Sequence, residues 1–159
     1  MRSPWILVSR CDMAAYPDCP YNTRVPAGLD MAQATPVVVL LHCGGGNAFA
    51  GLRGTCPDRA DGDGPDLNAP SCFHRIADRE GFVVVVPNGT GTPAAPQRRT
   101  WNAGGGRDGW HCVSGAACTD GVDDLGYLKA VLDDLDQWLH VDRGAVFATG
   151  LSNAAHRRH

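Results

Sequence analysis

The sequence has no long apolar run, and it has almost no clustering of positive charge. No apolar stretch in the chain approaches the roughly 18 residues that a membrane-spanning helix requires. The formal net charge is −3, and no basic cluster stands out except Arg157-Arg158, which lies beside two histidines. A protein that binds nucleic acid needs a basic surface to neutralise phosphates. We therefore expect neither a membrane nor a nucleic acid as a partner.

The glycine-rich segment His42-Cys43-Gly44-Gly45-Gly46-Asn47 lacks the signatures of nucleotide-binding loops. A dinucleotide-binding loop would need a third glycine at position 49, which is Phe49. A P-loop would need Gly-Lys followed by Ser or Thr, and this tripeptide is absent from the segment. The segment therefore does not indicate a nucleotide cofactor.

The N-terminus also lacks the apolar core of a signal peptide. Trp5-Ile6-Leu7-Val8 is too short for such a core, and Arg10 and Asp12 follow at once. The seven cysteines nevertheless indicate an oxidising compartment, and their odd number leaves at least one of them unpaired. From the cysteine content we expect a secreted or periplasmic protein, although no signal peptide is visible in this chain.

A serine lies in the turn that follows a short apolar run. Ala145 to Ala148 predicts a buried strand, and Gly150-Leu151-Ser152-Asn153-Ala154 comes directly after it. This is the spacing of the nucleophile elbow, G-x-S-x-G, with Ala154 at the second glycine position. Small residues at those two positions let a sharp strand-to-helix turn pass close to neighbouring backbone. Taken alone, the stretch also fits an ordinary turn at the end of a strand.

A second apolar run leads into the glycine-rich segment. Pro36 to Leu41 is a β-branched stretch typical of a strand that is covered on both faces of a parallel sheet. In serine esterases, a glycine-rich turn after such a strand supplies one backbone N–H group of the oxyanion hole. The two stretches together favour an acyl hydrolase in which Ser152 is the nucleophile.

Further segments follow in the order that is found in one group of enzymes. They are Val25-Pro26-Ala27-Gly28, Ala77 to Gly89, Thr100 to Gly106, and Gly121-Val122-Asp123-Asp124. With these segments the chain from about residue 24 resembles the secreted poly(3-hydroxybutyrate) depolymerase and feruloyl esterase group of α/β-hydrolases, over the first half or so of their catalytic domain. The resemblance implies a Ser-His-Asp hydrolase of carboxylic esters that uses no cofactor. Its substrate would be a polyester or an aromatic or short-chain ester.

The fold that we expect is a truncated three-layer α/β-hydrolase fold. Three parallel strands are recognisable at 36–42, 82–87 and 145–149, and the resemblance implies that the first of them lies between the other two. Residues 1–23 are expected to be an irregular segment with a short strand near 5–9. Residues 24–159 would then form the N-terminal part of the catalytic domain.

Two helices are predicted between these strands. Ser71 is expected to cap a helix over 72–80 that ends before Gly81. Asp120 is expected to cap an amphipathic helix over 121–139, whose leucines recur at steps of three and four. Asp123 and Asp124 would lie in its first turn, where carboxylates interact favourably with the helix dipole. We prefer this interpretation to a catalytic carboxylate pair.

The resemblance also assigns roles around the serine. The N–H of Asn153 and an N–H from the Cys43-Gly44 turn would form the oxyanion hole. His42, Trp101 and Asn102 would lie on the substrate side. Trp101 and Trp110 belong to a long irregular stretch, 88–119, and the alternative is that these tryptophans only attach the loop to the core.

The cysteines suggest disulfides rather than metal ligands. Cys112 and Cys118 bracket one loop, and Cys56 and Cys72 bracket another, so we expect each pair to be joined. A zinc site at Cys112, Cys118 and His111 lacks the usual ligand spacing. The aspartates of the loop 43–69 would need an acidic ligand at position 72 to form an EF-hand, where Cys72 stands, so we expect a solvated loop. No metal site is predicted.

The catalytic histidine and aspartate are not recognisable. Triad partners follow the serine in α/β-hydrolases, but the chain ends Ala154-Ala155-His156-Arg157-Arg158-His159. In a helix, His156 would point away from the site, and four further histidines (His42, His74, His111 and His140) precede the serine. We therefore expect an esterase fragment with impaired catalysis. The alternative is a non-catalytic fragment or a polymer- or carbohydrate-binding module that uses Trp101 and Trp110.

Such a fragment would expose one edge of its sheet. In the complete fold, the strand 145–149 pairs onward with a strand that this chain lacks. Unpaired backbone groups beside Val146 and Phe147 would favour pairing with another chain. We therefore expect self-association through this edge.

Overall fold

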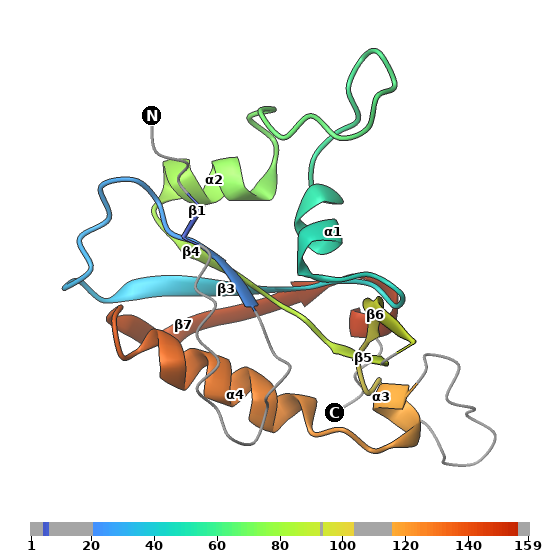
Figure 1. The fold of residues 1–159 in the computed structure, drawn as a ribbon. Coiled ribbons are helices and arrows are strands. Elements are labelled where there is room, and N and C mark those ends of the chain that lie inside the picture. The colour runs from blue at the N-terminus through green and yellow to red at the C-terminus, as the bar shows by residue number, and fades with distance from the viewer. Residues whose placement is uncertain (1–4, 7–20, 93, 104–115, 156–159) are drawn as a thin grey trace.

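The computed structural model describes residues 5–6, 21–92, 94–103 and 116–155, and its centre is a mixed β-sheet (Figure 1). Within these residues the sheet has five strands in the order β1-β2-β4-β3-β7. They are β1 (Trp5–Ile6), β2 (Tyr21–Arg24), β4 (Val83–Pro87), β3 (Thr35–Leu41) and β7 (Val141–Gly150). A separate antiparallel hairpin joins β5 (Thr90–Thr92) to β6 (Ala95–Thr100).

The three strands that the sequence predicts form the parallel part of the sheet. β3 pairs in parallel with β4 on one side and with β7 on the other, which confirms the expected order. β7 begins earlier than expected, at Val141 instead of 145. A register shift after Thr35 allows that residue to pair with Val141, so the ladder extends past the irregular Asp142-Arg143-Gly144 segment.

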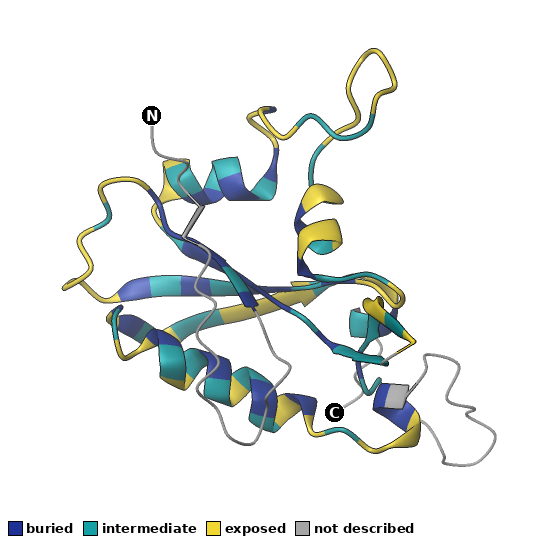
Figure 2. Cartoon of the chain, viewed as in Figure 1, coloured by how far each residue is buried: buried dark blue, intermediate teal, exposed yellow. Residues whose placement is uncertain are grey.

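Helices cover both faces of the sheet, which gives three layers (Figure 1). Val37, Val39, Val83 and Val85 share one core with the helix α4 (Asp124–Leu135). Leu40, Val84 and Val86 point the other way and pack with α1 (Ala48–Arg53) and α2 (Phe73–Glu80). Both faces of β4 are therefore buried (Figure 2). This explains why the strand begins with four consecutive valines, Val83 to Val86, and does not alternate with polar residues.

Several segments that were expected to be irregular have regular structure. Tyr21–Arg24 forms β2, which pairs antiparallel with β4, so the predicted boundary after residue 23 cuts through a strand. The predicted loop 43–69 contains α1, which Asn47 caps by accepting a hydrogen bond from the Ala50 N–H at 3.0 Å. The predicted irregular stretch 88–119 contains the β5–β6 hairpin and the short helix α3 (Ala116–Thr119).

The helix caps also differ from those expected. The N-cap of α2 is Cys72 and not Ser71, because the Cys72 N–H closes a turn with the carbonyl of Ala69 at 3.0 Å. Gly81 ends this helix as expected, with a φ of 77°. The N-cap of α4 is Asp123 and not Asp120, because Gly121 between them has a non-helical φ of 63°.

The helix α4 is also shorter than the predicted span 121–139. It ends at Leu135, and its C-cap Asp136 accepts a hydrogen bond from the Val141 N–H at 3.1 Å. Asp136 also accepts from the Arg143 Nε at 2.7 Å, so the turn is held against the start of β7. Leu139 is still buried in the core beyond the end of the helix, which accounts for the longer leucine pattern.

In the part of the chain that the structure describes, no helix is long and apolar enough to span a bilayer. A disulfide joins Cys56 to Cys72, one of the two pairs expected from the sequence. Cys118 is also disulfide-bonded, and its expected partner Cys112 lies outside the described residues. Cys43 is free and exposed.

Candidate functional site

The glycine-rich turn and the serine turn meet at one edge of the sheet. β3 and β7 are parallel neighbours, and their last residues, Leu41 and Gly150, are paired in the register. The two turns that follow them are therefore adjacent. A Cβ placed on Gly44 would lie 3.2 Å from the Cβ of Asn153, so the absence of a side chain at Gly44 allows this close approach.

Ser152 has the backbone conformation of a strained elbow. Its φ is 60°, and among the described residues it alone is a non-glycine residue with a positive φ. This region is sparsely populated by residues with a side chain, and such strain is concentrated at functional sites. Ser152 is exposed and begins the short 3₁₀ helix η1 (Ser152–Ala155), so its side chain is held at the end of β7 where solvent can reach it.

Small residues on both sides of the serine make this turn possible. A Cβ on Gly150 would lie 2.7 Å from the Cβ of Ala154 and 3.0 Å from the carbonyl oxygen of Leu41. Real Cβ atoms do not approach other atoms so closely, so position 150 requires glycine. Ala154 already fills the space opposite Gly150, which explains why alanine can stand at the second glycine position of the motif.

The side chain of Asn153 fixes the backbone beside the serine. Its Oδ1 accepts a hydrogen bond from the Trp101 N–H at 2.7 Å, and its Nδ2 donates to the Trp101 carbonyl at 3.1 Å. The indole Nε1 of Trp101 in turn donates to the His42 carbonyl at 2.8 Å. All three residues are buried, so this chain of hydrogen bonds links the serine turn rigidly to the glycine-rich turn.

His42 lies buried beneath the glycine-rich turn, and its imidazole ring is neutral. The Gly89 N–H donates to its Nε2 at 3.0 Å, so Nε2 carries no proton. The proton is therefore on Nδ1, which donates to the Cys43 carbonyl at 2.9 Å. Burial lowers the pKa of His42 and keeps the ring uncharged. Both ring nitrogens are thus occupied, and His42 is neither a general base nor a group that faces the substrate.

The β5–β6 hairpin holds the other side of the same turn. The Gly45 N–H donates to the Arg99 carbonyl at 2.8 Å, and the Arg99 N–H donates to the Gly46 carbonyl at 2.8 Å. Gly45 has a φ of 79°, which a residue with a side chain would rarely adopt. The turn that would supply an oxyanion donor is therefore fixed by β6 as well as by His42.

The acids at the start of α4 have separate structural roles. Asp123 caps the helix by accepting from the Gly126 N–H at 2.9 Å. Asp124 is buried, and its Oδ2 accepts from the Asn102 N–H at 2.5 Å, while the Asn102 Nδ2 donates to the Val122 carbonyl at 2.9 Å. The position of both acids at the start of the helix predicted only an interaction with the helix dipole. The anchoring of the segment after Trp101 by Asp124 has no signal in the local sequence.

Two of the expected substrate-side residues are structural. His42 and Trp101 are buried, and their rings lie with centroids 4.9 Å apart beneath the two turns. Asn102 is only half-buried and lines a cavity of about 510 Å³ between α4 and the end of β7. Ser152 does not line this cavity. Trp110 and His156 lie outside the described residues.

Sequence reasoning did not identify Gly89 as part of this site. Its N–H sets the tautomer of His42, and a Cβ on it would lie 2.4 Å from the carbonyl oxygen of Thr100. The only signal in the sequence was Pro87-Asn88-Gly89 after a strand, which predicts a turn but not its contacts.

The aspartates of the loop after α1 are largely occupied in local turns. The Asp61 Oδ1 accepts from the Asp63 N–H at 3.0 Å, and the Asp66 Oδ1 accepts from the Asn68 N–H at 2.9 Å. Asp58, Asp61 and Asp63 are exposed. Short-range turns of this kind are typical of aspartate in solvated loops.

A parallel sheet in the order β4-β3-β7, with helices on both faces and a strained serine turn at its carboxyl edge, is an α/β-hydrolase fold. The acetyl xylan esterase from Aspergillus awamori has a similar structure, with a TM-score of 0.50 and 16% identity over 86% of this chain. A thermostable esterase superposes with a TM-score of 0.51 and 20% identity over 87% of this chain. No family model and no curated protein matches the sequence.

These similarities establish the fold and nothing finer. The chain spans 39% of the acetyl xylan esterase and 32% of the thermostable esterase. It therefore corresponds to less than half of each of those two chains.

Proposed function

We propose that this chain carries the nucleophile and the oxyanion hole of a serine carboxylic-ester hydrolase. The observation that carries the proposal is the positive φ of Ser152 at the carboxyl end of β7, directly beside the glycine-rich turn. A turn that only ended a strand would not need this strain, nor a glycine at 150 to accommodate it. The resemblance to poly(3-hydroxybutyrate) depolymerases and feruloyl esterases suggests a polyester or an aromatic ester as the substrate.

In this proposal Ser152 acts by covalent catalysis. Its Oγ attacks the ester carbonyl, the alcohol leaves, and water later hydrolyses the acyl-enzyme. The negative charge on the carbonyl oxygen is stabilised by the N–H of Asn153 and by one N–H from the Cys43-Gly44 turn. The hydrogen bonds from Asn153 to Trp101 and from Trp101 to His42 hold both donors in place before the substrate arrives. No cofactor takes part.

The histidines that the structure describes do not provide a general base. His42 uses both of its ring nitrogens below the site. His74 bonds to the Leu67 carbonyl beside the disulfide. His140 precedes β7, about 30 Å of extended strand away from Ser152. With no base among the described residues, we expect weak ester hydrolysis, with a residual acceleration of about 10³-fold over water from the oxyanion hole.

Labelling with a fluorophosphonate probe tests the role of Ser152. The purified chain should react slowly at Ser152, because the described residues provide no base to activate the hydroxyl. Ser152→Ala should not react, and the exposed serine variant Ser71→Ala should react like the parent. The same proteins are then assayed with a short-chain p-nitrophenyl ester. An unlabelled parent chain would favour a non-catalytic fragment. Fast turnover that is lost in Ser152→Ala would show that a base is present and would contradict the expectation of impaired catalysis.

The alternative of a polymer-binding module is weakened by the position of Trp101. A stacking platform needs an exposed ring face, but Trp101 is 4% exposed and its indole N–H is bonded to His42. Trp110, the other ring of that proposal, lies outside the described residues. Loss of binding to insoluble polyester in Trp110→Ala, with intact fluorophosphonate labelling, would support a separate binding role for that residue.

We also propose a secreted or periplasmic location. The disulfide Cys56–Cys72 supports this proposal, because such bonds persist mainly in oxidising compartments. Cell fractionation with thiol trapping tests it. Recovery of the chain in the cytosol with Cys56 and Cys72 reduced would contradict it.

A further inference from the structure

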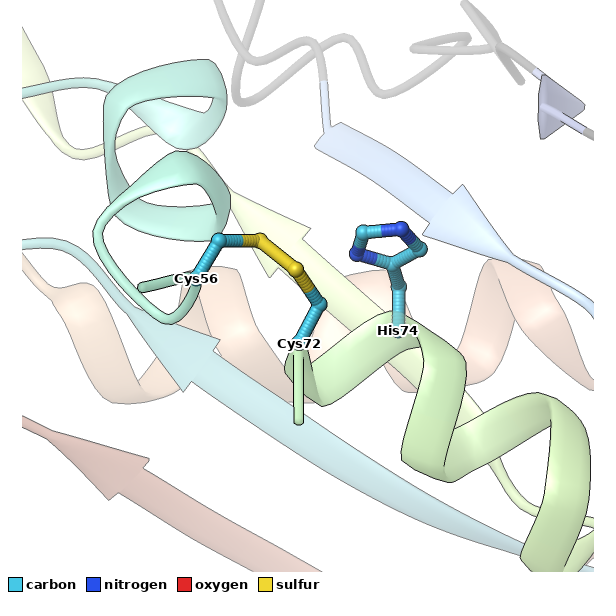
Figure 3. A group of neighbouring side chains, drawn as sticks. All are labelled: Cys56, Cys72 and His74. Atoms are coloured by element: carbon cyan, nitrogen blue, oxygen red, sulfur yellow. A yellow bond between two sulfur atoms is a disulfide. The ribbon is translucent and has the colours of Figure 1, made fainter. Parts of the chain in front are cut away.

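Cys56, Cys72 and His74 form a compact cluster on the face of the sheet that α1 and α2 cover (Figure 3). Cys56 follows the end of α1, Cys72 caps α2, and His74 lies in the first turn of α2. One candidate ligand atom from each residue lies within 4.8 Å of the other two. Thiolate and imidazole are the ligands that Zn²⁺ prefers in structural sites.

His74 is oriented like a metal-ligating histidine. Its Nε2 lies 3.0 Å from the carbonyl oxygen of Leu67, which can only accept, so Nε2 carries the proton. In the neutral ring this tautomer leaves Nδ1 unprotonated, and Figure 3 shows the Nδ1 side of the ring turned toward the disulfide. Metal-ligating histidines usually donate their second ring N–H to a carbonyl or carboxylate, which fixes the tautomer and the ring orientation.

The spacing of the three side chains fits a tetrahedral metal site once the sulfurs are separated. Zinc bonds of about 2.3 Å to sulfur and about 2.0 Å to nitrogen place the ligand atoms roughly 3.5–3.8 Å apart. The present separations, all within 4.8 Å, can reach these values through side-chain movements of about 1–2 Å. The segments that end α1 and begin α2 therefore do not need to be rearranged.

A cavity borders the cluster at Cys56, whereas Cys72 and His74 do not line it. It has a volume of about 590 Å³ and is lined by Cys56 together with Arg53, Asp58 and Pro65. Cys72 and His74 are buried, whereas Cys56 is half-buried. Cys56 is therefore the side of the cluster from which an ion would enter, and a water molecule there would complete the coordination.

We propose that Cys56, Cys72 and His74 form a redox-gated Zn²⁺ site, which the disulfide closes and reduction opens. A dithiol reductant transfers two electrons and two protons to the disulfide, the S–S bond breaks, and the reductant becomes a disulfide itself. Zn²⁺ then displaces the two thiol protons and binds both thiolates and the Nδ1 of His74. The proposal does not depend on ester hydrolysis, because the cluster shares no residue with the serine site.

The experiment uses the full chain in its oxidised form and after reduction with a phosphine that is removed under argon. Each form is titrated with Zn²⁺ against a chromophoric chelator, and with Co²⁺ for its thiolate charge-transfer absorption. Cys56→Ser/Cys72→Ser removes the site, and Cys112→Ser/Cys118→Ser is the matched control with as many thiols removed. His74→Gln tests the third ligand.

The reduced parent and the matched control should bind one more Zn²⁺ per chain than Cys56→Ser/Cys72→Ser does, and the oxidised parent should lack this site. His74→Gln should weaken the site by about 100-fold or more, since even second-shell partners of metal ligands commonly contribute 10–100-fold. Zn²⁺ should also protect Cys56 and Cys72 of the reduced parent from alkylation, a measurement that needs no variant to fold.

The proposal is overturned if the reduced parent binds no more Zn²⁺ than Cys56→Ser/Cys72→Ser. Equal binding by the oxidised chain would also overturn it. So would unprotected Cys56 and Cys72 at saturating Zn²⁺, or a His74→Gln variant that is folded by circular dichroism and binds as tightly as the parent.

Discussion

At the scale of single residues, the serine turn requires glycine, which has no Cβ, at two closely packed positions. Gly150 lies where any Cβ would overlap Ala154 and the carbonyl of Leu41, and Gly44 lies where a larger residue would press on Asn153. The strained φ of Ser152 is maintained because Gly150 before it is tightly packed and Asn153 after it is bonded to Trp101. The geometry of the nucleophile therefore rests on glycines in two strand-end turns.

Replacement of Gly150 by alanine should destabilise this turn. The new Cβ would meet the Ala154 Cβ at 2.7 Å, and relief requires backbone movement that we expect to cost about 1–3 kcal/mol of unfolding free energy. The control is Gly144→Ala in the same strand, where the nearest atom is a side-chain oxygen of Asp142 at 3.3 Å and no backbone lies in the way. Urea unfolding compares the two variants, and equal stability would contradict the tight packing of the elbow.

His42 should make the folded chain sensitive to mild acid. Burial lowers its pKa, and the nearby Arg99 lowers it further, so the unfolded chain binds a proton at a higher pH than the folded chain. Its contribution to stability is complete above the ordinary histidine pKa of about 6.5 and is lost as the pH falls from there toward the lowered value.

Urea unfolding of the parent and of His42→Gln, at a pH above and a pH below the ordinary histidine value, measures this effect. The parent should lose more stability on acidification than the variant does. The variant should keep a residual pH dependence from His74, whose pKa burial also lowers. An identical pH dependence in both proteins would rule out the buried neutral role of His42.

At the scale of elements, the disulfide joins the end of α1 to the start of α2. The two cysteines are 16 residues apart, and the chain between them has no helix and only one isolated β-bridge among its described residues. A crosslink across a loop of this length restricts the unfolded chain, and the loop-entropy model gives about 3 kcal/mol.

The oxidised parent should therefore unfold at higher urea concentration than Cys56→Ser/Cys72→Ser. Because the crosslink causes the stabilisation, the difference in unfolding urea concentration should shrink when both proteins are measured under reducing conditions. Equal stability of the two oxidised proteins would show that the loop is ordered by other contacts.

At the scale of the whole molecule, β7 is the free edge of the described sheet. It pairs with β3 on one side, and it is the last strand in the order (Figure 1). Val146 packs against the core that β3 and β4 share with α4, whereas Phe147, the next residue along the strand, is 60% exposed. Leu151, just past the strand, is 75% exposed. A long edge with apolar side chains favours pairing with another chain.

The isolated chain should therefore self-associate through β7. Size-exclusion chromatography should show species larger than the monomer, and Phe147→Lys should reduce them because charge on an edge strand opposes pairing. Phe49→Lys is the matched control, since Phe49 is 58% exposed but lies on α1. A monomeric parent with strongly protected amides at 145–149 in hydrogen exchange would mean that the edge is covered by part of the chain itself.

The sequence alone determined the local features of this protein. The apolar runs at 36–42, 82–87 and 145–149 predict parallel strands, and all three form, because such runs are favourable in a sheet that is covered on both faces. The expectation that the third run is buried is wrong, since Ala145 and Val146 are only half-buried and the next three residues are exposed at the edge of the sheet. The Gly-x-Ser-x-Ala spacing likewise predicts the sharp turn, since the close approach is made by residues near one another in the chain. Both features depend on short-range geometry, which the order of residues specifies directly.

The tertiary structure decided which distant groups complete the site. Asn153 bonds to Trp101 across 52 positions, and the tautomer of His42 is set by Gly89 across 47 positions. These partners follow from the register that places Leu41 beside Gly150 and from the hairpin that returns β6 to the glycine-rich turn. Local propensity contains no information on such pairs, because a hydrogen bond between distant segments exists only after the core has packed and aligned them.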